Sequence, residues 1–243
     1  MRIETELKYD FDDVLIRPKR STLTSRKEVD LNRLYKFKYG GTYFGIPIMA
    51  ANMDGVGTLD VSREIGDLGL FTCLRKSISE KFLIEELKAT EGNNIAVTIG
   101  RNNDDLEKLK RIAKELSPCY RIKYICIDVA NGYSQSFVDF IKQVRDEISY
   151  AIIIAGNVVT GEMVEELLLA GADIIKVGIG SGSVCTTRIK TGVGYPQFSS
   201  IAECADAAHG LNGHIVADGG CTSPGDVAKA FGAGADFVML GSM

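Results

Sequence analysis

The sequence predicts an α/β fold, specifically a (β/α)8 barrel of the TIM type, from three observations. From Ile46 onward, short β-branched runs alternate with amphipathic stretches of helical character. Most of the short runs are apolar on both faces, as expected of parallel strands that helices cover. The chain has 243 residues, which suits a single domain of this architecture.

Eight runs are expected to form the strands, and in chain order they are Ile46–Met53, Leu70–Leu74, Ile95–Gly100, Tyr124–Ala130, Ala151–Val158, Ile174–Gly180, His214–Asp218 and Phe237–Gly241. Such an alternation occurs in a barrel or in a doubly wound sheet, and eight strands at roughly regular spacing favour the barrel.

Helices are expected between these strands. The segment Thr160–Ala170 has a helical pattern, and Pro224 stands where a first helical turn tolerates proline. Gly171-Ala172-Asp173 and Gly234-Ala235-Asp236 repeat one pattern, a helix that stops at a glycine before a buried strand. Met243 follows the last predicted strand by two residues, so we expect residues 1–243 to be one catalytic barrel domain, truncated after its eighth strand.

The composition excludes several classes of protein. Apolar residues make up 45% and charged residues 25% of the chain, with 26 glycines, which is typical of a soluble α/β enzyme. The net charge of −4 argues against nucleic-acid binding. The sequence shows neither a signal peptide nor an apolar run near the ~18 residues of a membrane helix. Its six scattered cysteines argue against zinc or disulfide frameworks and favour the cytoplasm.

A long polar loop, Ser181 to Ser199, follows the sixth predicted strand, and such loops are usually functional. In a barrel it lies at the carboxyl end of a strand, where active sites are built. Cys185 in this loop is a candidate nucleophile, with a free loop thiol as the alternative reading. The two histidines, His209 and His214, are expected to be structural, which disfavours a Cys/His hydrolase.

Glycines and acidic residues mark the ends of other predicted strands. Asp218-Gly219-Gly220 follows the seventh strand and Gly241-Ser242 ends the eighth, where barrel enzymes commonly bind phosphate. Either loop alone is as well explained by a tight turn, but the two together favour a phosphorylated ligand. Asp128 and Asp218 can accept ribose hydroxyls, and Lys76 can reach a charged ligand.

These features together resemble the GMP reductases within the IMP dehydrogenase/GMP reductase family, over essentially the whole chain. The segments that carry the resemblance are residues 10–21, 51–54, 126–134, 155–163, 176–197, 203–210 and 218–221. The resemblance implies NADPH-dependent reductive deamination of GMP to IMP with release of ammonia. It also implies a homotetramer, a mobile flap and a helix after the eighth strand. The flap and this last helix are missing from residues 1–243.

The resemblance further implies roles for individual residues. Cys185 would form a covalent thioimidate with the purine, and Thr187 would transfer protons. The carbonyl groups of Gly180, Gly182 and Cys185 would bind a monovalent cation, potassium. The substrate-binding residues would be Met53, Ser183, Asp218, Gly219, Gly220, Gly241 and Ser242. The residues on the NADPH side would be Lys76, Asp128 and Asn157.

Two alternatives remain open at this point. An IMP dehydrogenase would share the barrel and the nucleophile, but only a short helix separates Ser79 from Ile95, where that enzyme usually carries a regulatory insertion. A catalytically inactive barrel that binds purine nucleotides is the other alternative, and the presence of Cys185 and Thr187 argues against it.

Overall fold

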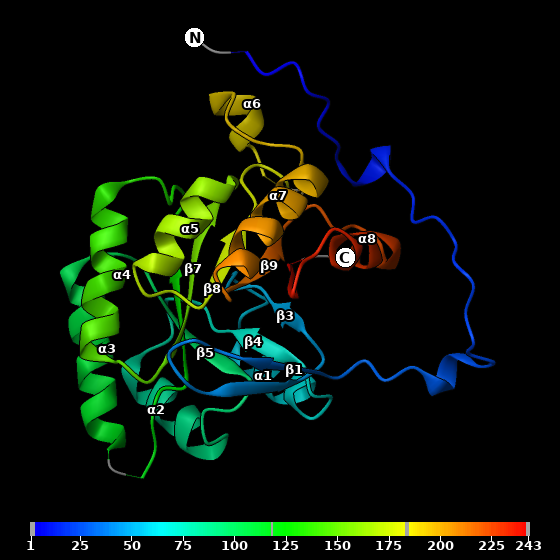
Figure 1. Cartoon of the computed structure of the whole chain (residues 1–243). Helices are drawn as coiled ribbons and strands as arrows, with labels where there is room; N and C mark the ends of the chain where they lie inside the picture. Colours follow the sequence, from blue (N-terminus) through cyan, green and yellow to red (C-terminus); the bar gives the residue numbers. More distant parts are fainter. Residues whose placement is uncertain (1–2, 118, 183–184, 242–243) are drawn as a thin grey trace.

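Eight parallel strands close into a barrel in the order β10-β3-β4-β5-β6-β7-β8-β9 (Figure 1). The structure is a computed structural model that describes residues 3–117, 119–182 and 185–241. The barrel strands are β3 (Ile48–Ala50), β4 (Phe71–Cys73), β5 (Ile95–Ile99), β6 (Tyr124–Asp128), β7 (Ile152–Val158), β8 (Ile174–Val177), β9 (His214–Asp218) and β10 (Phe237–Leu240). The predicted TIM-type barrel is therefore confirmed, with a strand in each of the eight predicted runs.

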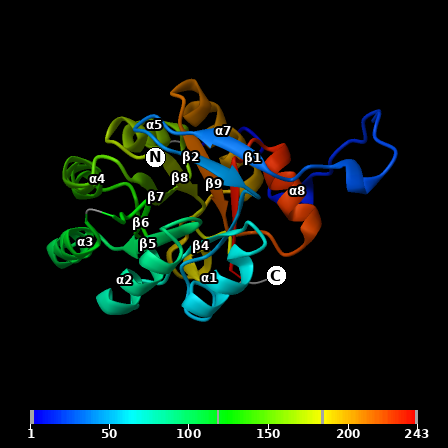
Figure 2. The same cartoon turned by 90° about the horizontal axis from the view of Figure 1, so that it is seen from below.

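Helices surround the barrel (Figure 2). They are α1 (Leu59–Gly66), α2 (Glu80–Ala89), α3 (Asn103–Leu116), α4 (Gln135–Glu147), α5 (Gly161–Leu169), α7 (Gln197–Gly210) and α8 (Pro224–Gly232), while the short helix α6 (Thr187–Thr191) lies beyond the end of the barrel (Figure 1). Pro224 occupies the first turn of α8, and Gly171 and Gly234 adopt positive φ angles of 117° and 111° after α5 and α8, as their positions predicted. Among the described residues, no helix is both long and apolar enough to cross a bilayer.

The barrel has two apolar layers because successive strand side chains point alternately inward and outward. Inward-facing side chains such as Phe71, Ile154 and Phe237 fill the barrel interior. Outward-facing side chains such as Val97 and Ile153 pack against the helices. Polar side chains such as Asp128 and Asp218 follow these apolar layers at the carboxyl ends of β6 and β9.

An antiparallel hairpin, which the sequence analysis did not predict, covers the end of the barrel where the strands begin (Figure 2). It consists of β1 (Arg33–Lys36) and β2 (Thr42–Gly45). Phe37 and Tyr43 are buried among the inward-facing barrel residues, and the Tyr43 hydroxyl donates a 2.6 Å hydrogen bond to the carbonyl oxygen of Ile46. The hairpin therefore lies at the opposite end of the barrel from the carboxyl ends of the strands, which it does not cover.

The long loop after β8 is more structured than expected. It contains the short helix α6, which ends at Gly192 in a left-handed conformation with φ of 70°. Helix α7 then begins at Gln197, two residues before the expected end of the loop at Ser199. Two short 3-10 helices, η1 (Phe11–Asp13) and η2 (Arg26–Glu28), lie in the N-terminal segment, which runs away from the barrel after η1 (Figure 1).

Candidate active site

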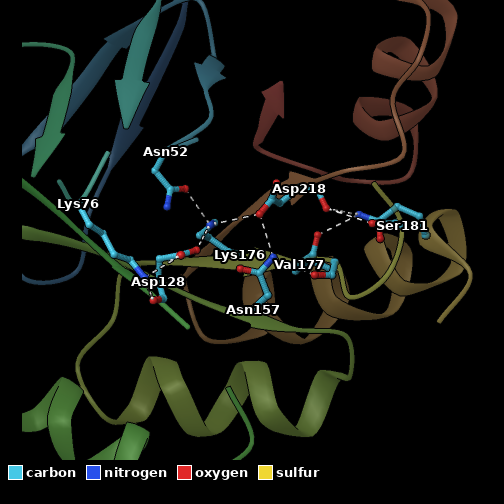
Figure 3. A network of polar contacts seen from close by, with 10 residues as sticks. Asn52, Lys76, Asp128, Asn157, Lys176, Val177, Ser181 and Asp218 are labelled. Atoms are coloured by element: carbon cyan, nitrogen blue, oxygen red, sulfur yellow. Dashed lines mark hydrogen bonds and ion pairs between the residues drawn. The ribbon is translucent and has the colours of Figure 1, made fainter. Parts of the chain in front are cut away.

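A buried lysine stands at the centre of a polar network at the carboxyl ends of the strands (Figure 3). Lys176 on β8 is only 2% exposed. Its Nζ lies 2.6 Å from Oδ1 of Asp128 on β6 and 3.2 Å from Oδ2 of Asp218 on β9. Asn52, after β3, accepts a further hydrogen bond of 3.3 Å. Four strands thus direct polar groups to one point inside the barrel mouth.

Two further predicted residues belong to the same network (Figure 3). Lys76, after β4, donates to the carbonyl oxygen of Asp128 at 2.7 Å and lies 3.2 Å from its Oδ2. Asn157 on β7 donates through Nδ2 to Asp218 Oδ2 and to the carbonyl oxygen of Gly178, both at 2.8 Å. Asn157 therefore ties the end of β9 to the glycine turn that follows β8.

The network fixes the charge of its members. Burial alone would raise the pKa of Asp128, but ion pairs with Lys176 and Lys76 hold it below its ordinary value. Burial would likewise lower the pKa of Lys176, but the carboxylates of Asp218 and Asp128 keep it well above its ordinary value. At neutral pH the barrel mouth therefore holds a buried ammonium group beside ionised Asp128.

Cys185 lies on the loop that follows β8, just before α6. Its Sγ is 3.2 Å from Oγ1 of Thr187, and its backbone N–H donates to the carbonyl oxygen of Gly182 at 3.0 Å. Hydrogen bonds from the hydroxyl and backbone N–H of Thr187 lower the pKa of the Cys185 thiol, and the positive charge of Arg188 adds to this effect. A partly buried thiol whose pKa is lowered is suited to nucleophilic attack.

A cavity of about 100 Å³ lies beside this loop at the barrel mouth. Its lining residues are Ala51, Met53, Gly182, Asp218, Gly219, Gly220, Cys221, Met239, Leu240 and Gly241. Gly219 and Gly220 have φ angles of 92° and 86°, a backbone shape that exposes amide groups to a ligand. A larger cavity of about 550 Å³ lies at the opposite end, between the hairpin and the strand starts, so size alone does not locate the site.

The sequence also matches known proteins. The family model described as IMP dehydrogenase / GMP reductase domain matches residues 8–243. This chain belongs to the IMP dehydrogenase/GMP reductase family. A GMP reductase of Caenorhabditis elegans is 56% identical over 250 residues, which cover 100% of this chain and 68% of the relative. GMP reductase 1 of Homo sapiens is 57% identical over 249 residues, covering 100% and 70%.

A solved structure supports the same assignment. The inosine 5' monophosphate dehydrogenase of Legionella pneumophila superposes with a TM-score of 0.82 at 32% identity, covering 97% of this chain and 69% of that one. The resemblance inferred from sequence motifs, and with it the prediction of an enzyme of the IMP dehydrogenase/GMP reductase family, is therefore confirmed.

The structure gathers the predicted site residues of this family member into two adjoining groups. Lys76, Asp128 and Asn157 belong to the Lys176 network. The predicted substrate residues that line the cavity of about 100 Å³ are Met53, Asp218, Gly219, Gly220 and Gly241. Ser183 and Ser242 lie outside the described residues. Asp218 belongs to both groups, so the residues predicted to bind substrate and those predicted to bind the cofactor meet at one carboxylate.

Both histidines lie far from this chemistry, as expected for structural residues. His209 Nε2 is 3.0 Å from Oδ2 of Asp236, and His214 Nδ1 is 3.2 Å from its Oδ1. Asp236 immediately precedes β10, at the strand-start end of the barrel that the hairpin covers. Neither histidine is placed to act as a base for Cys185.

Sequence reasoning missed Lys176 and Asn52 as site residues. The available signal was a single lysine inside the otherwise apolar strand Ile174-Ile175-Lys176-Val177. Lys176 is two residues from Ile174, so both point inward, and a charged residue inside a barrel must be paired. The two acidic residues already placed at strand ends were its expected partners.

Proposed function

We propose that this family member reduces GMP to IMP with NADPH and releases ammonia, with Cys185 as the covalent nucleophile. The observation that carries the proposal is the Cys185–Thr187 pair, 3.2 Å apart, on the loop beside a cavity of about 100 Å³ whose lining includes Gly219 and Gly220. Relatives named GMP reductase, at 56% to 57% identity over the whole chain, support the choice of reaction.

Cys185 supplies the nucleophile in this proposal. Its thiolate adds to C2 of the purine, and the C2–N bond then breaks, so that the 2-amino group leaves as ammonia after it accepts a proton. The purine would then be joined to Sγ as a thioimidate, and the thiolate would be regenerated when C2 is reduced and the C–S bond breaks. Dividing the substitution into these steps lowers the barrier of each one.

Thr187 transfers the protons in this proposal. Its hydroxyl stabilises the thiolate before attack, and at 3.2 Å from Sγ it lies beside any group that is bonded to the sulfur. A hydroxyl at this position can donate a proton to the departing amine.

The glycines of the cavity bind the phosphate in this scheme, and Asp218 binds ribose hydroxyls. A Cβ atom at Gly219 would lie 2.7 Å from the Ser181 hydroxyl oxygen and 3.1 Å from the backbone nitrogen of Gly182. We call residues 218–220 the phosphate loop and residues 178–196 the nucleophile loop. The two loops are packed so closely at Gly219 that only glycine fits. Binding energy from the phosphate can therefore position the purine relative to Cys185.

NADPH would lie on the side of Lys76, Asp128 and Asn157, and when bound it supplies the hydride. The structure fits this role. Asp128 is ionised and about a quarter of its side chain is exposed, so it can accept hydroxyl groups of a ribose. Both hydrogen bonds donated by Asn157 Nδ2 are already used inside the protein, which leaves its Oδ1 to accept from a carboxamide.

A potassium ion is proposed to bind the carbonyl groups of Gly180, Gly182 and Cys185. Gly180 has a φ of 76°, and a Cβ atom there would lie 2.6 Å from the Arg188 side chain, so the turn requires glycine. Backbone carbonyl oxygens at this turn would replace the hydration shell of a monovalent cation. A cytoplasmic homotetramer completes the proposal, and light scattering of the purified protein tests the assembly.

The serine variant of Cys185 tests the proposed chemistry. Cys185→Ser should lower kcat by about 1,000-fold or more, while GMP binding measured by calorimetry stays within about threefold of wild type. Cys119→Ser is the matched control, because Cys119 is an exposed thiol on the connection between α3 and β6. Turnover near the wild-type rate in Cys185→Ser would contradict the assignment of Cys185 as the nucleophile.

A further inference from the structure

The side chain of Arg188 joins the two ends of the loop that carries Cys185. Its Nη2 donates a hydrogen bond to the carbonyl oxygen of Tyr195, at the far end of that loop. The stem of the side chain fills the space beside two glycines, since a Cβ atom would lie 2.6 Å from Arg188 Cγ at Gly180 and 2.7 Å from it at Gly194. Any displacement of Arg188 therefore alters the loop on both sides of Cys185.

A residue from the N-terminal segment holds Arg188 in this position. Asp10 Oδ2 lies 3.0 Å from Arg188 Nη1, although the two residues are 178 positions apart. The other carboxylate oxygen of Asp10 accepts a hydrogen bond from the backbone N–H of Gln197, the first residue of α7. One carboxylate thus connects the nucleophile loop to the start of the next helix, where a negative charge is also favoured by the helix dipole.

The neighbours of Asp10 fasten it to the barrel, and we call residues 9–11 the N-terminal strap. The backbone of Tyr9 exchanges two hydrogen bonds with Ser199, of 2.8 Å and 3.1 Å. Phe11 is buried, and a Cβ atom at Gly220 would lie 3.1 Å from its ring. The carbonyl oxygen of Phe11 accepts from Lys229 of α8 at 2.9 Å. The strap therefore contacts both the phosphate loop and the helix that follows the nucleophile loop.

Gln197 extends this connection into the barrel wall. It is fully buried, and its Nε2 donates to the carbonyl oxygen of Val177 on β8 at 2.9 Å. Val177 precedes the glycine turn that begins the nucleophile loop. A continuous path of polar contacts thus runs from Asp10 through Gln197 to the strand from which the loop departs.

We propose that Asp10 and Arg188 are positioning residues, and that the N-terminal strap uses their ion pair to hold Cys185 in the geometry required for attack on the purine. This inference rests on the proposed function for its effect on turnover. The ion pair itself is half exposed, so its electrostatic stabilisation of the folded chain is small. The ion pair acts instead by fixing the position of Cys185, because a displacement of the reacting atom by about 1 Å can lower the rate about 100-fold.

Asp10→Asn tests the proposal, because asparagine keeps an acceptor for Gln197 but loses the charge that holds Arg188. We expect kcat for GMP reduction to fall about 10- to 100-fold, GMP affinity to stay within about twofold and the melting temperature to stay within about 3 °C. Asp12→Asn is the matched control, since Asp12 is exposed on η1 and one carboxylate is removed in both variants. This control should behave as wild type.

Combining the variants shows whether the two residues act together. Once Arg188→Gln has removed the partner, the further change of Asp10→Asn should alter kcat by less than about twofold. Independent effects that multiply in the double variant would overturn the proposal, as would wild-type kcat in Asp10→Asn.

Hydrogen exchange provides a readout that needs no substrate. Amides in residues 185–200 should exchange at least about threefold faster in Asp10→Asn than in Asp12→Asn, while those of α3 stay unchanged. Equal exchange in the two variants would overturn the proposal, whether or not the wild-type protein reduces GMP. If the wild-type protein does not reduce GMP but the exchange difference between the variants is present, the proposed function is contradicted. The proposal that the N-terminal strap positions the nucleophile loop is then still supported.

Discussion

Replacing Lys176 by methionine removes the ammonium group that lies between Asp128 and Asp218 in the barrel mouth. Methionine has a similar length and no charge, so the change leaves little cavity and isolates the electrostatic effect. The two carboxylates would then face each other across a buried space without the cation that separates them. We expect this variant to be strongly destabilised at neutral pH.

The size of the effect follows from the exposure of the partners. Removing one member of a buried ion pair costs about 3–5 kcal/mol. Asp128 and Asp218 keep 25% and 22% of their side-chain exposure, and Lys76 remains 3.2 Å from Asp128, so the lower end applies. A loss of about 3 kcal/mol lowers the melting temperature of a domain of this size by roughly 10 °C.

The pH dependence of the loss provides a second test. The lowered pKa of Asp128 means that its pairing stabilises the fold above the unfolded-state value of about 3.9, and that this stabilisation disappears as pH falls through the folded-state value. The difference between wild type and Lys176→Met should therefore be greatest near pH 7 and should narrow below about pH 4.

Thermal unfolding followed by circular dichroism at several pH values measures both effects. Lys176→Arg, which keeps the charge, should lose less than Lys176→Met, and adding Asp128→Asn to Lys176→Met should recover part of the loss. A melting temperature for Lys176→Met within about 2 °C of wild type at pH 7 would refute the electrostatic reasoning.

Three further predictions concern the scaffold. Hydrogen bonds at the N-terminal cap of α8 outweigh the effect of burial and lower the pKa of Asp226 to about 2. Asp226→Asn should therefore lower the free energy of unfolding in urea by about 1–3 kcal/mol at pH 7. Near pH 2 the variant should differ little from wild type, because wild type has then lost most of the same stabilisation. Gly178→Ala places a Cβ atom 2.0 Å from the backbone carbonyl oxygen of Asp218, whereas the space beside Gly192 is open. Gly192→Ala should lower the free energy of unfolding by about 1 kcal/mol, and Gly178→Ala should lower it several times more. Equal melting temperatures for the two variants would contradict this. Burial would lower the pKa of His214, but its pairing with Asp236 raises it. This pairing therefore stabilises the fold fully below about pH 6.5, and the stabilisation is lost as pH rises through the raised pKa. The unfolding free energies of wild type and His214→Gln should differ by about 1 kcal/mol at about pH 6 and converge by about pH 9, and a difference that does not change with pH would contradict this.

The barrel was predictable because each strand carries its own signal. Runs such as Ile152-Ile153-Ile154 are apolar on both faces, which only a parallel strand covered on both sides requires. The β1–β2 hairpin was missed because its side chains are largely exposed and its burial comes from contacts with the strand starts that are distant in sequence. Tyr43 packs against Phe71 and Phe237, and no local pattern encodes those partners.

Positions in the candidate site were predictable where an acidic residue coincides with a strand end, as at Asp128 and Asp218. Lys176 was missed because a lysine inside an apolar strand becomes meaningful only when the inward direction and the acidic partners are known. Asp10 carried even less signal, since its contact with Arg188 joins residues 178 positions apart. Local propensity cannot encode such a contact, which depends on the closure of the whole barrel.

A direct product assay tests the central claim, the proposed reduction of GMP. The purified protein is incubated with GMP and NADPH, and in parallel with IMP and NAD⁺, while purine products, ammonia and cofactor oxidation state are all quantified. We predict equal amounts of IMP, ammonia and NADP⁺ in the first reaction, and far slower conversion in the second. Formation of NADH from IMP, with no IMP formed from GMP, would contradict the account and favour the dehydrogenase reaction instead.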